Sequence, residues 1–235
     1  MNSPPDRSEI GRRLAALKKR IGFAMERAGR SEPLTLVAVT KAFPAEVAVL
    51  TRSIGQLDLG ESRPQELRDK APLVPSPVRW HFIGPLQRNK VKYVVGVAEL
   101  IHSIDSLRLA EAIERRAEAA RITQDLLVQV DLSGDSGKQG VAPGDIEATL
   151  EAMRELPRLR IRGLMTMPAA EADLEESRAH FRELARLSAT LRASATLPAG
   201  ANELSMGMTR DFEVAIDEGA TIIRVGTAIF GPRIL

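Results

Sequence analysis

The chain has 235 residues, and its 33 Lys and Arg side chains nearly balance 31 Asp and Glu, which argues against nucleic acid as a partner. Cysteine is absent, so disulfides, thiolate nucleophiles and thiolate metal sites are excluded. Residues 1–7 are polar and unlike a signal peptide, and no apolar run is long enough to span a bilayer, so we expect a cytoplasmic protein without a membrane partner.

The start of the chain carries the pattern of an amphipathic helix over residues 8–28. Its apolar side chains recur at steps of three and four, as a helix with one buried face requires. Gly29 follows as a typical helix stop. The apolar positions are Ile10, Leu14, Leu17, Ile21 and Met25.

Beyond this helix, eight short apolar runs alternate with helical patterns. The runs, each typical of a buried strand, cover residues 34–40, 56–60, 78–83, 99–104, 125–131, 159–165, 201–206 and 221–226. The helical patterns between them cover residues 45–53, 64–70, 87–95, 106–120, 144–155, 174–192 and 209–218. This alternation predicts an α/β protein with a parallel sheet and right-handed crossovers.

Eight such units can close into a barrel, and the main alternative is an open, doubly wound sheet. No G-x-G-x-x-G motif follows the first run, and the units continue evenly to the end of the chain. We therefore predict one domain over residues 1–235, a single (β/α)8 TIM barrel with an extra N-terminal helix.

The first apolar run ends on a single amine, Lys41. In this fold the carboxyl ends of the strands form the active-site face, and an amine there is a typical Schiff-base group. The alternative is that Lys41 is only the first solvated residue after a strand.

Small and hydroxyl-bearing residues follow the seventh and eighth runs, where this fold commonly binds phosphate. They are Ser205, Gly207, Gly226 and Thr227. Glycine lets backbone N–H groups approach an anion, although these residues could also serve only as turn formers. A phosphate site opposite Lys41 favours either a phosphosugar or pyridoxal phosphate as the ligand.

Arg224 distinguishes these two ligands. It lies two residues before Gly226, so the strand period predicts that its side chain points into the barrel mouth. A guanidinium there suits the pyridine nitrogen of pyridoxal phosphate, and it would keep that nitrogen unprotonated and weaken the ring as an electron sink. The alternative is a structural ion pair with Asp105 or Asp131.

Other candidate sites have less support. His81 and His102 both lie near strand ends, and either Glu61 or Asp131 could complete a metal site, but the ligand spacing is absent and we predict no metal. Ser205 lacks a nucleophile elbow. The Gly-rich segment 134–140 is interpreted as a mobile loop that could act as a lid.

Seven blocks, in order over nearly the whole chain, resemble the YggS/PROSC family of pyridoxal phosphate homeostasis proteins. They are 38–41 (Ala-Val-Thr-Lys), 60–66 (Gly-Glu-Ser-Arg-Pro-Gln-Glu), 80–84 (Trp-His-Phe-Ile-Gly), 102–105 (His-Ser-Ile-Asp), 163–165 (Gly-Leu-Met), 204–208 (Leu-Ser-Met-Gly-Met) and 224–231 (Arg-Val-Gly-Thr-Ala-Ile-Phe-Gly). The family usually has Asn where this chain has Ser62, and Pro64 is also unusual there.

The resemblance implies a barrel like the N-terminal domain of alanine racemase, with pyridoxal 5'-phosphate as cofactor. Lys41 would form the aldimine, and Arg224 would contact the pyridine nitrogen. Ser205, Gly226 and Thr227 would bind the phosphate. For a second cofactor site, Lys138 and Lys90 are the residues we would test.

The resemblance also implies a function in pyridoxal phosphate homeostasis, as a carrier or regulator that serves pyridoxal-phosphate-dependent apoenzymes. A two-base racemase needs a second base, usually a Tyr from a C-terminal domain, whereas this sequence ends at Leu235 and its only Tyr is Tyr93. We therefore predict no catalytic residues and no efficient catalysis, in a protein that we expect to be a monomer. The alternatives are a weak fold-type III amino-acid racemase, another pyridoxal phosphate enzyme, or a phosphosugar aldolase.

Overall fold

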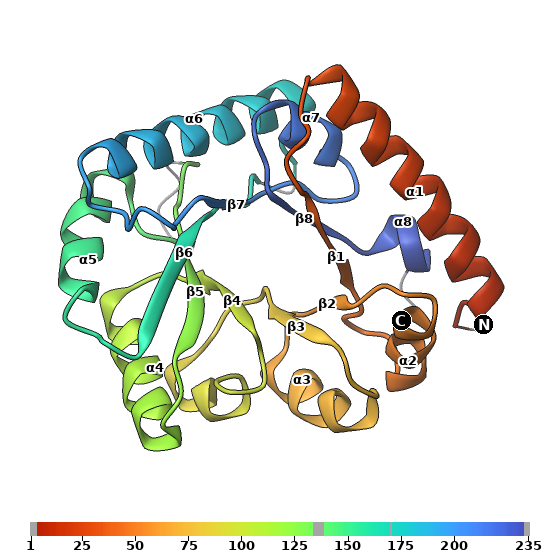
Figure 1. Cartoon of the computed structure of the whole chain (residues 1–235), viewed down its shortest axis with the longest axis horizontal. Helices are drawn as coiled ribbons and strands as arrows, with labels where there is room; N and C mark the ends of the chain where they lie inside the picture. The colour runs from red at the N-terminus through yellow and green to blue at the C-terminus, as the bar shows by residue number, and fades with distance from the viewer. Residues whose placement is uncertain (1–3, 134–138, 170, 233–235) are drawn as a thin grey trace.

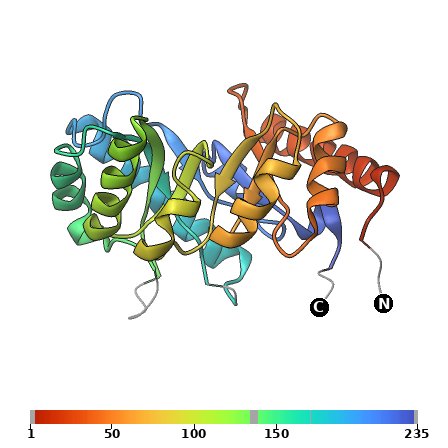
Figure 2. The ribbon, with the colours of Figure 1, turned by 90° about the horizontal axis from the view of Figure 1, so that it is seen from below.

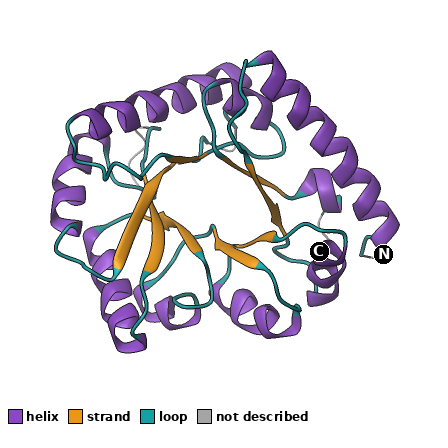
Figure 3. Ribbon diagram, in the orientation of Figure 1, coloured by secondary structure: helices purple, strands orange, loops and turns teal. Residues whose placement is uncertain are grey.

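The computed structural model describes residues 4–133, 139–169 and 171–232, and eight strands among them close into a barrel in the order β1 to β8. Every neighbouring pair is parallel, including β1 with β8, so the predicted (β/α)8 barrel is confirmed. Figure 3 shows the strands as an inner ring within a ring of helices. The strands are β1 (Thr35–Val39), β2 (Asp58–Glu61), β3 (Arg79–Phe82), β4 (Leu100–Ile104), β5 (Gln124–Gln129), β6 (Leu159–Met165), β7 (Glu203–Ser205) and β8 (Ile222–Val225).

Helices and short 3₁₀ turns connect the strands (Figure 1). The α-helices are α1 (Arg7–Arg27), α2 (Ala45–Ser53), α3 (Pro64–Lys70), α4 (Leu107–Ala120), α5 (Ile146–Met153), α6 (Leu174–Ala193), α7 (Phe212–Asp217) and α8 (Thr227–Phe230). The 3₁₀ turns are η1 (Ala71–Leu73), η2 (Arg88–Tyr93) and η3 (Pro143–Asp145). Figure 2 shows α3 and α4 on the near side of the ring. No helix within the described ranges is both long and apolar enough to cross a membrane.

The predicted N-terminal helix is present as α1. Asp6 caps it by accepting a hydrogen bond of 2.8 Å from the backbone N–H of Glu9. The side chains of Ile10, Leu14 and Leu17 are buried, and the helix packs against α2, α7 and α8 (Figure 1). The helix therefore covers the seam where the last strands meet β1.

One predicted helix differs from the structure. Residues 87–95 do not form an α-helix but contain the 3₁₀ turn η2, with a hydrogen bond of 3.0 Å from the Val94 N–H to the Val91 carbonyl. Val91, Val94 and Val95 are buried in the core between sheet and helices. Their β-branched side chains disfavour the α-helix, and burying all three holds the segment in this tighter turn.

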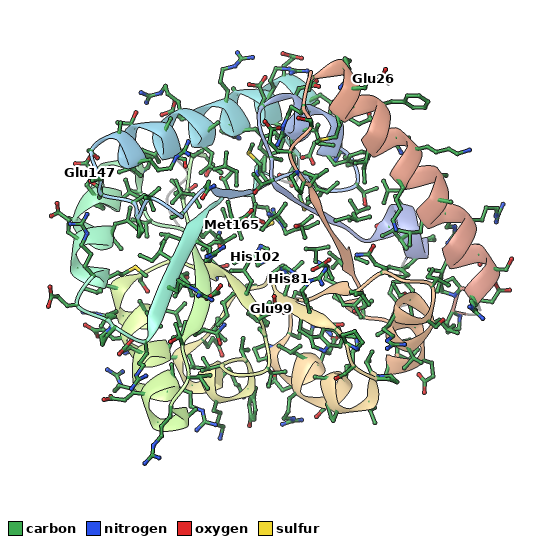
Figure 4. All side chains as sticks on the ribbon, in the orientation of Figure 1. Glu26, His81, Glu99, His102, Glu147 and Met165 are labelled. Carbon is green, nitrogen blue, oxygen red and sulfur yellow. The ribbon has the colours of Figure 1, made fainter. Side chains whose placement is uncertain are left out.

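The interior of the barrel is partly apolar and partly polar. Six buried apolar side chains form a cluster inside the ring of strands, namely Val37, Val39, Leu100, Leu127, Met165 and Ile222. Buried polar residues on the strands include His81 on β3, His102 on β4, Ser205 on β7 and Arg224 on β8. Figure 4 places His81, His102 and Met165 within the ring. Buried polar groups need hydrogen-bond partners, so the contacts of these side chains determine their role in the interior.

The two departures from the family pattern after β2 fit the fold. Pro64 is the first residue of α3, where its missing N–H has no helical partner to lose. The Ser62 carbonyl lies so close to Gly84 that a Cβ there would stand 2.1 Å from its oxygen. The ends of β2 and β3 are thus held together by backbone contact rather than by the side chain of Ser62.

Candidate functional site

A cavity of about 450 Å³ lies at the carboxyl ends of the strands. Lys41, Arg224, Gly226 and Thr227 line it together, as predicted from their places at the ends of strands 1 and 8. Ser205 does not line it. The other lining residues are Val39, Phe43, Ile83, Met167, Ala169, Ala172, Leu174, Ser177, Met208, Thr209, Arg210, Asp211 and Gly231.

A sharp turn directly after β1 presents Lys41. The Thr40 N–H still donates to the Gly60 carbonyl at 2.9 Å, as in a continuing strand pair. Ala42 has a φ of 65°, in the left-handed region, and its N–H donates to Glu66 Oε2 at 3.0 Å. The backbone therefore reverses at Lys41 and leaves the side chain on the wall of the cavity.

A buried ion cluster supports this turn from behind. The Lys70 ammonium donates to Glu61 Oε1 at 2.7 Å, to Glu66 Oε2 at 3.2 Å and to the Thr40 carbonyl at 3.0 Å. Burial raises the pKa of Glu61, and the Lys70 charge opposes that shift. Burial would also raise the pKa of Glu66, but the Ala42 N–H and the Lys70 charge together lower it. Lys70 thus stabilises two carboxylates that hold the end of β1.

Arg224 is a buried cation that contacts no carboxylate among the residues that the structure describes. Its Nη1 donates to Ser205 Oγ at 2.5 Å and its Nη2 donates to the Thr166 carbonyl at 3.1 Å. Burial lowers the pKa of Arg224 to about 10, with the Asp211 charge opposing, so the guanidinium stays charged at neutral pH. Within the described part of the chain it makes no ion pair with Asp105 or Asp131, so that alternative is wrong.

The loop after β7 folds back onto β8 and brings Asp211 to the cavity. The Arg224 N–H donates to the Gly207 carbonyl at 2.9 Å, and Gly207 has a φ of 89°. A Cβ at Gly207 would lie 2.5 Å from that of Ala215, so this close packing requires glycine. Asp211 accepts a 2.6 Å hydrogen bond from the Met208 N–H, and burial raises its pKa. Asp211 was not among the predicted site residues, because the sequence placed it inside a helix over 209–218, whereas α7 begins only at Phe212.

The two barrel histidines bond to one another. His81 Nδ1 lies 2.9 Å from His102 Nε2, and His102 Nδ1 lies 2.8 Å from Ser205 Oγ. Burial lowers the pKa of His102 well below its usual value, and the nearby His81 and Arg224 charges add to the effect. Among the described residues, no group of three or more His, Asp or Glu is arranged to hold a metal ion.

Three predicted features lie away from the cavity or outside the described ranges. Ser205 is fully buried beneath the cavity, so its phosphate contact stays a prediction. Lys90 lies in η2, where its ammonium is 5.8 Å from the centre of the Tyr93 ring. The segment 134–138, which holds Lys138 and most of the proposed lid, is outside the described residues.

Comparison with known proteins adds a family. The family model described as "Alanine racemase, N-terminal domain" matches residues 13–233. The pyridoxal phosphate homeostasis protein of Aquifex aeolicus is 43% identical over 225 residues, which cover 94% of this chain and 97% of the relative. The chain belongs to the pyridoxal phosphate homeostasis family. Another family member, from Escherichia coli K12, is 37% identical over 231 residues, with 96% of this chain and 97% of the relative covered.

Solved structures include chains whose fold is similar to this one. PipY from Synechococcus elongatus, solved with PLP bound, is 35% identical with a TM-score of 0.82, covering 94% of this chain and all of PipY. Alanine racemase from Corynebacterium glutamicum has a TM-score of 0.73 at 20% identity, covering 99% of this chain and 64% of the racemase. The racemase likeness concerns the fold alone.

The chemistry of the cavity fits the cofactor of this family. Lys41 is the only lysine among the described lining residues, and it offers a primary amine. Arg224 uses two N–H groups within the protein, which leaves further donors for an acceptor atom. Gly226 and Thr227 supply backbone and hydroxyl donors, while Val39, Phe43 and Ile83 are apolar. An aldehyde, a ring nitrogen, a phosphate and an aromatic face would each find a suitable partner.

Proposed function

We propose that the chain binds pyridoxal 5'-phosphate reversibly in this cavity and contributes to pyridoxal phosphate homeostasis as a carrier or regulator without efficient catalysis. The observation that carries the proposal is the convergence of Lys41, Arg224, Gly226 and Thr227 on one cavity. The family names and the PLP-bound structure of PipY support the same ligand.

Each residue has a distinct role in this proposal. When bound, pyridoxal phosphate supplies an aldehyde that condenses reversibly with a primary amine, and Lys41, which lines the cavity, would provide that amine. Arg224 would donate to the ring nitrogen and keep it unprotonated, because a guanidinium cannot accept a proton. Gly226 and Thr227 would hold the phosphate, and Ser205 stays a predicted third contact.

The absence of efficient catalysis is supported by what surrounds the cavity. Tyr93 lies elsewhere, and the guanidinium of Arg68 stacks 4.8 Å from its ring centre. The described lining residues include no Tyr and no His. Racemisation needs an acid or base on each face of the substrate, and Lys41 would provide only one.

Asp211 favours one alternative, a weak racemase of fold type III. Its carboxyl group lines the cavity, and burial raises its pKa, which is typical of an acid–base residue. If Asp211 acts as the second base, single-enantiomer amino acids are racemised by the loaded protein, and Asp211→Asn abolishes this turnover. No racemisation above the Asp211→Asn background would support the carrier.

Absorbance of the loaded protein tests the proposal. After incubation with pyridoxal phosphate and removal of the excess, we expect a visible band that borohydride bleaches. The band should be absent from Lys41→Ala and present in Lys90→Ala, because Lys90 lies outside the cavity. An identical spectrum for wild type and Lys41→Ala would overturn the proposal.

Transfer to recipients extends the proposal. The partners we propose are pyridoxal-phosphate-dependent apoenzymes, and the test adds the loaded protein to an apoenzyme and follows its activation. Direct transfer is supported if activation is faster than spontaneous loss of the cofactor from the barrel, and refuted if the two rates agree. The monomeric state and the cytoplasmic location stay predictions.

A further inference from the structure

A line of hydrogen bonds crosses the barrel interior from its floor to the cavity. At the floor, His81 Nε2 on β3 lies 3.2 Å from Asp58 Oδ1 on β2. His81 then contacts His102 on β4 at 2.9 Å, and His102 contacts Ser205 Oγ at 2.8 Å across the barrel on β7. Ser205 Oγ accepts from Arg224 on β8. Figure 4 shows the two histidines side by side inside the ring.

The lower end of this line fixes its direction. Burial alone would raise the pKa of Asp58, but hydrogen bonds from His81 and Arg79 lower it to about 2. The carboxylate therefore only accepts, so His81 must carry its proton on Nε2. His81 Nδ1 can then accept from His102 Nε2, which leaves His102 Nδ1 as an acceptor.

The upper end requires the same direction. Arg224 has no acceptor atom, so Ser205 Oγ receives its Nη1–H. Among the described residues, the other partner of the Ser205 hydroxyl is His102 Nδ1, and a buried hydroxyl donates its proton to an acceptor within reach. His102 is buried between Ser205 and His81 and close to the charge of Arg224, which keeps its ring neutral. Both ends therefore select one tautomer for each histidine.

We infer that Asp58, His81, His102 and Ser205 form one directional hydrogen-bond chain that positions the Arg224 guanidinium at the cavity. Asp58 sets the direction of the hydrogen-bond line, the two histidines transmit it, and Ser205 presents a lone pair to Arg224. In this arrangement the Ser205 hydroxyl has no proton left for the phosphate contact predicted from the sequence. The three residues below Ser205 are positioning residues, because none of them lines the cavity.

The charges around this line of hydrogen bonds support the direction inferred for it. Asp58 faces Arg79 at 2.6 Å and His81, while His102 faces only His81 and Ser205 within hydrogen-bond distance. Above them, Arg224 faces the Thr166 carbonyl and the charge of Asp211. His102, in the middle of the hydrogen-bond line, is thus neutral, while the Asp58 carboxylate and the Arg224 guanidinium stand at its two ends.

Nitrogen NMR of the cofactor-free wild-type protein tests the direction, and variants are needed only to assign the signals. The sequence has three histidines, so the ring nitrogens of His81, His102 and His180 can be assigned from single substitutions. We expect both barrel histidines as Nε2–H tautomers at neutral pH. A His102 ring protonated on Nδ1 would overturn the inference whether or not the protein binds pyridoxal phosphate.

Variants at the barrel floor test the positioning role, which rests on the proposed function. Asp58→Asn keeps the shape but adds an amide donor, so only the Arg224 end still imposes the direction and the contact that holds His81 is weakened. Asp125→Asn is the matched control, because Asp125 also pairs with an arginine of the next strand, Arg160, at 2.6 Å, but touches no histidine.

Affinity for pyridoxal phosphate gives the second readout. We expect about fivefold weaker binding in Asp58→Asn, the usual effect of disturbing one hydrogen bond, and wild-type binding in Asp125→Asn. Equal affinities for the two variants would refute the positioning role. If neither variant nor the wild type bound the cofactor, the proposed function would fail, while the tautomers would still test the chain.

Discussion

Two buried cations stand at the same end of the barrel, and their partners are opposite in kind. Lys70 contacts two carboxylates, Glu61 at 2.7 Å and Glu66 at 3.2 Å. Arg224 contacts a hydroxyl and a backbone carbonyl, and no carboxylate of the described residues lies within contact of its charge. Burial of both side chains is similar, so the difference lies in how each charge is neutralised.

This difference separates a structural cation from one kept for a ligand. The charge of Lys70 is satisfied inside the protein, and the cluster secures the turn that carries Lys41. Arg224 keeps its positive charge although burial disfavours the charged form and lowers its pKa. Functional sites commonly retain such destabilising groups because the ligand supplies the missing partner.

The largest expected effect on folding is at Lys70. Lys70→Met leaves the fully buried Glu61 without its cation and Glu66 with only Arg63, and breaking a buried ion pair in this way costs about 3–5 kcal/mol. Urea unfolding measures the loss. Adding Glu61→Gln to Lys70→Met should recover part of it, and a single variant as stable as wild type would contradict the structural role.

Arg224→Met should affect binding and leave folding nearly unchanged. Affinity for pyridoxal phosphate should fall about a hundredfold, because a charged hydrogen bond to the ligand is lost. Relief of the buried charge, about 3 kcal/mol from the pKa shift, offsets the unpaired Thr166 carbonyl and Ser205 hydroxyl. We expect the unfolding free energy to stay within about 1 kcal/mol of wild type. A loss as large as that of Lys70→Met would make Arg224 structural.

His102 should make stability depend on pH. Its folded pKa lies well below the usual value of 6.5, so below pH 6.5 the unfolded chain binds more protons. Stability is therefore complete above pH 6.5 and decreases as pH falls, by about 1.4 kcal/mol per pH unit until the folded pKa is reached. His102→Gln should flatten the pH dependence of the unfolding free energy, measured by urea unfolding between pH 7 and 5. His180→Gln is the control, because it leaves the hydrogen-bond line in the barrel intact. An equal pH dependence in wild type and His102→Gln would refute the lowered pKa of His102 as its cause.

Asp58 should contribute the smallest of these effects. Its pKa is lowered to about 2, so its stabilisation is present above the unfolded pKa of 3.8 and is lost as pH falls towards 2. With allowance for the solvent around Arg79, Asp58→Asn should cost about 1–2 kcal/mol at pH 7 and almost nothing at pH 2. Asp125→Asn, whose partner Arg160 is exposed, should cost less than about 1 kcal/mol. A difference that persists at pH 2 would show that the charge is not responsible.

The cavity residues could be predicted from sequence because strand ends converge in a closed barrel. Lys41, Gly226 and Thr227 follow strands, and Arg224 follows from the strand period. The contact between His102 and Ser205 could not be predicted, because 103 residues separate them and the contact depends on how the barrel closes. Asp211 was missed because the turn at Gly207, with its φ of 89°, returns the loop to the cavity.

The two lysines of this region provide the most direct test. The protein loaded with pyridoxal phosphate is reduced with borohydride, digested, and the modified lysine is identified by mass spectrometry. We predict that the pyridoxyl group is found on Lys41 and not on Lys70, whose ammonium is already bonded to Glu61 and Glu66. A pyridoxyl group on Lys70 or Lys90, with Lys41 unmodified, would contradict the assignment of this cavity as the cofactor site.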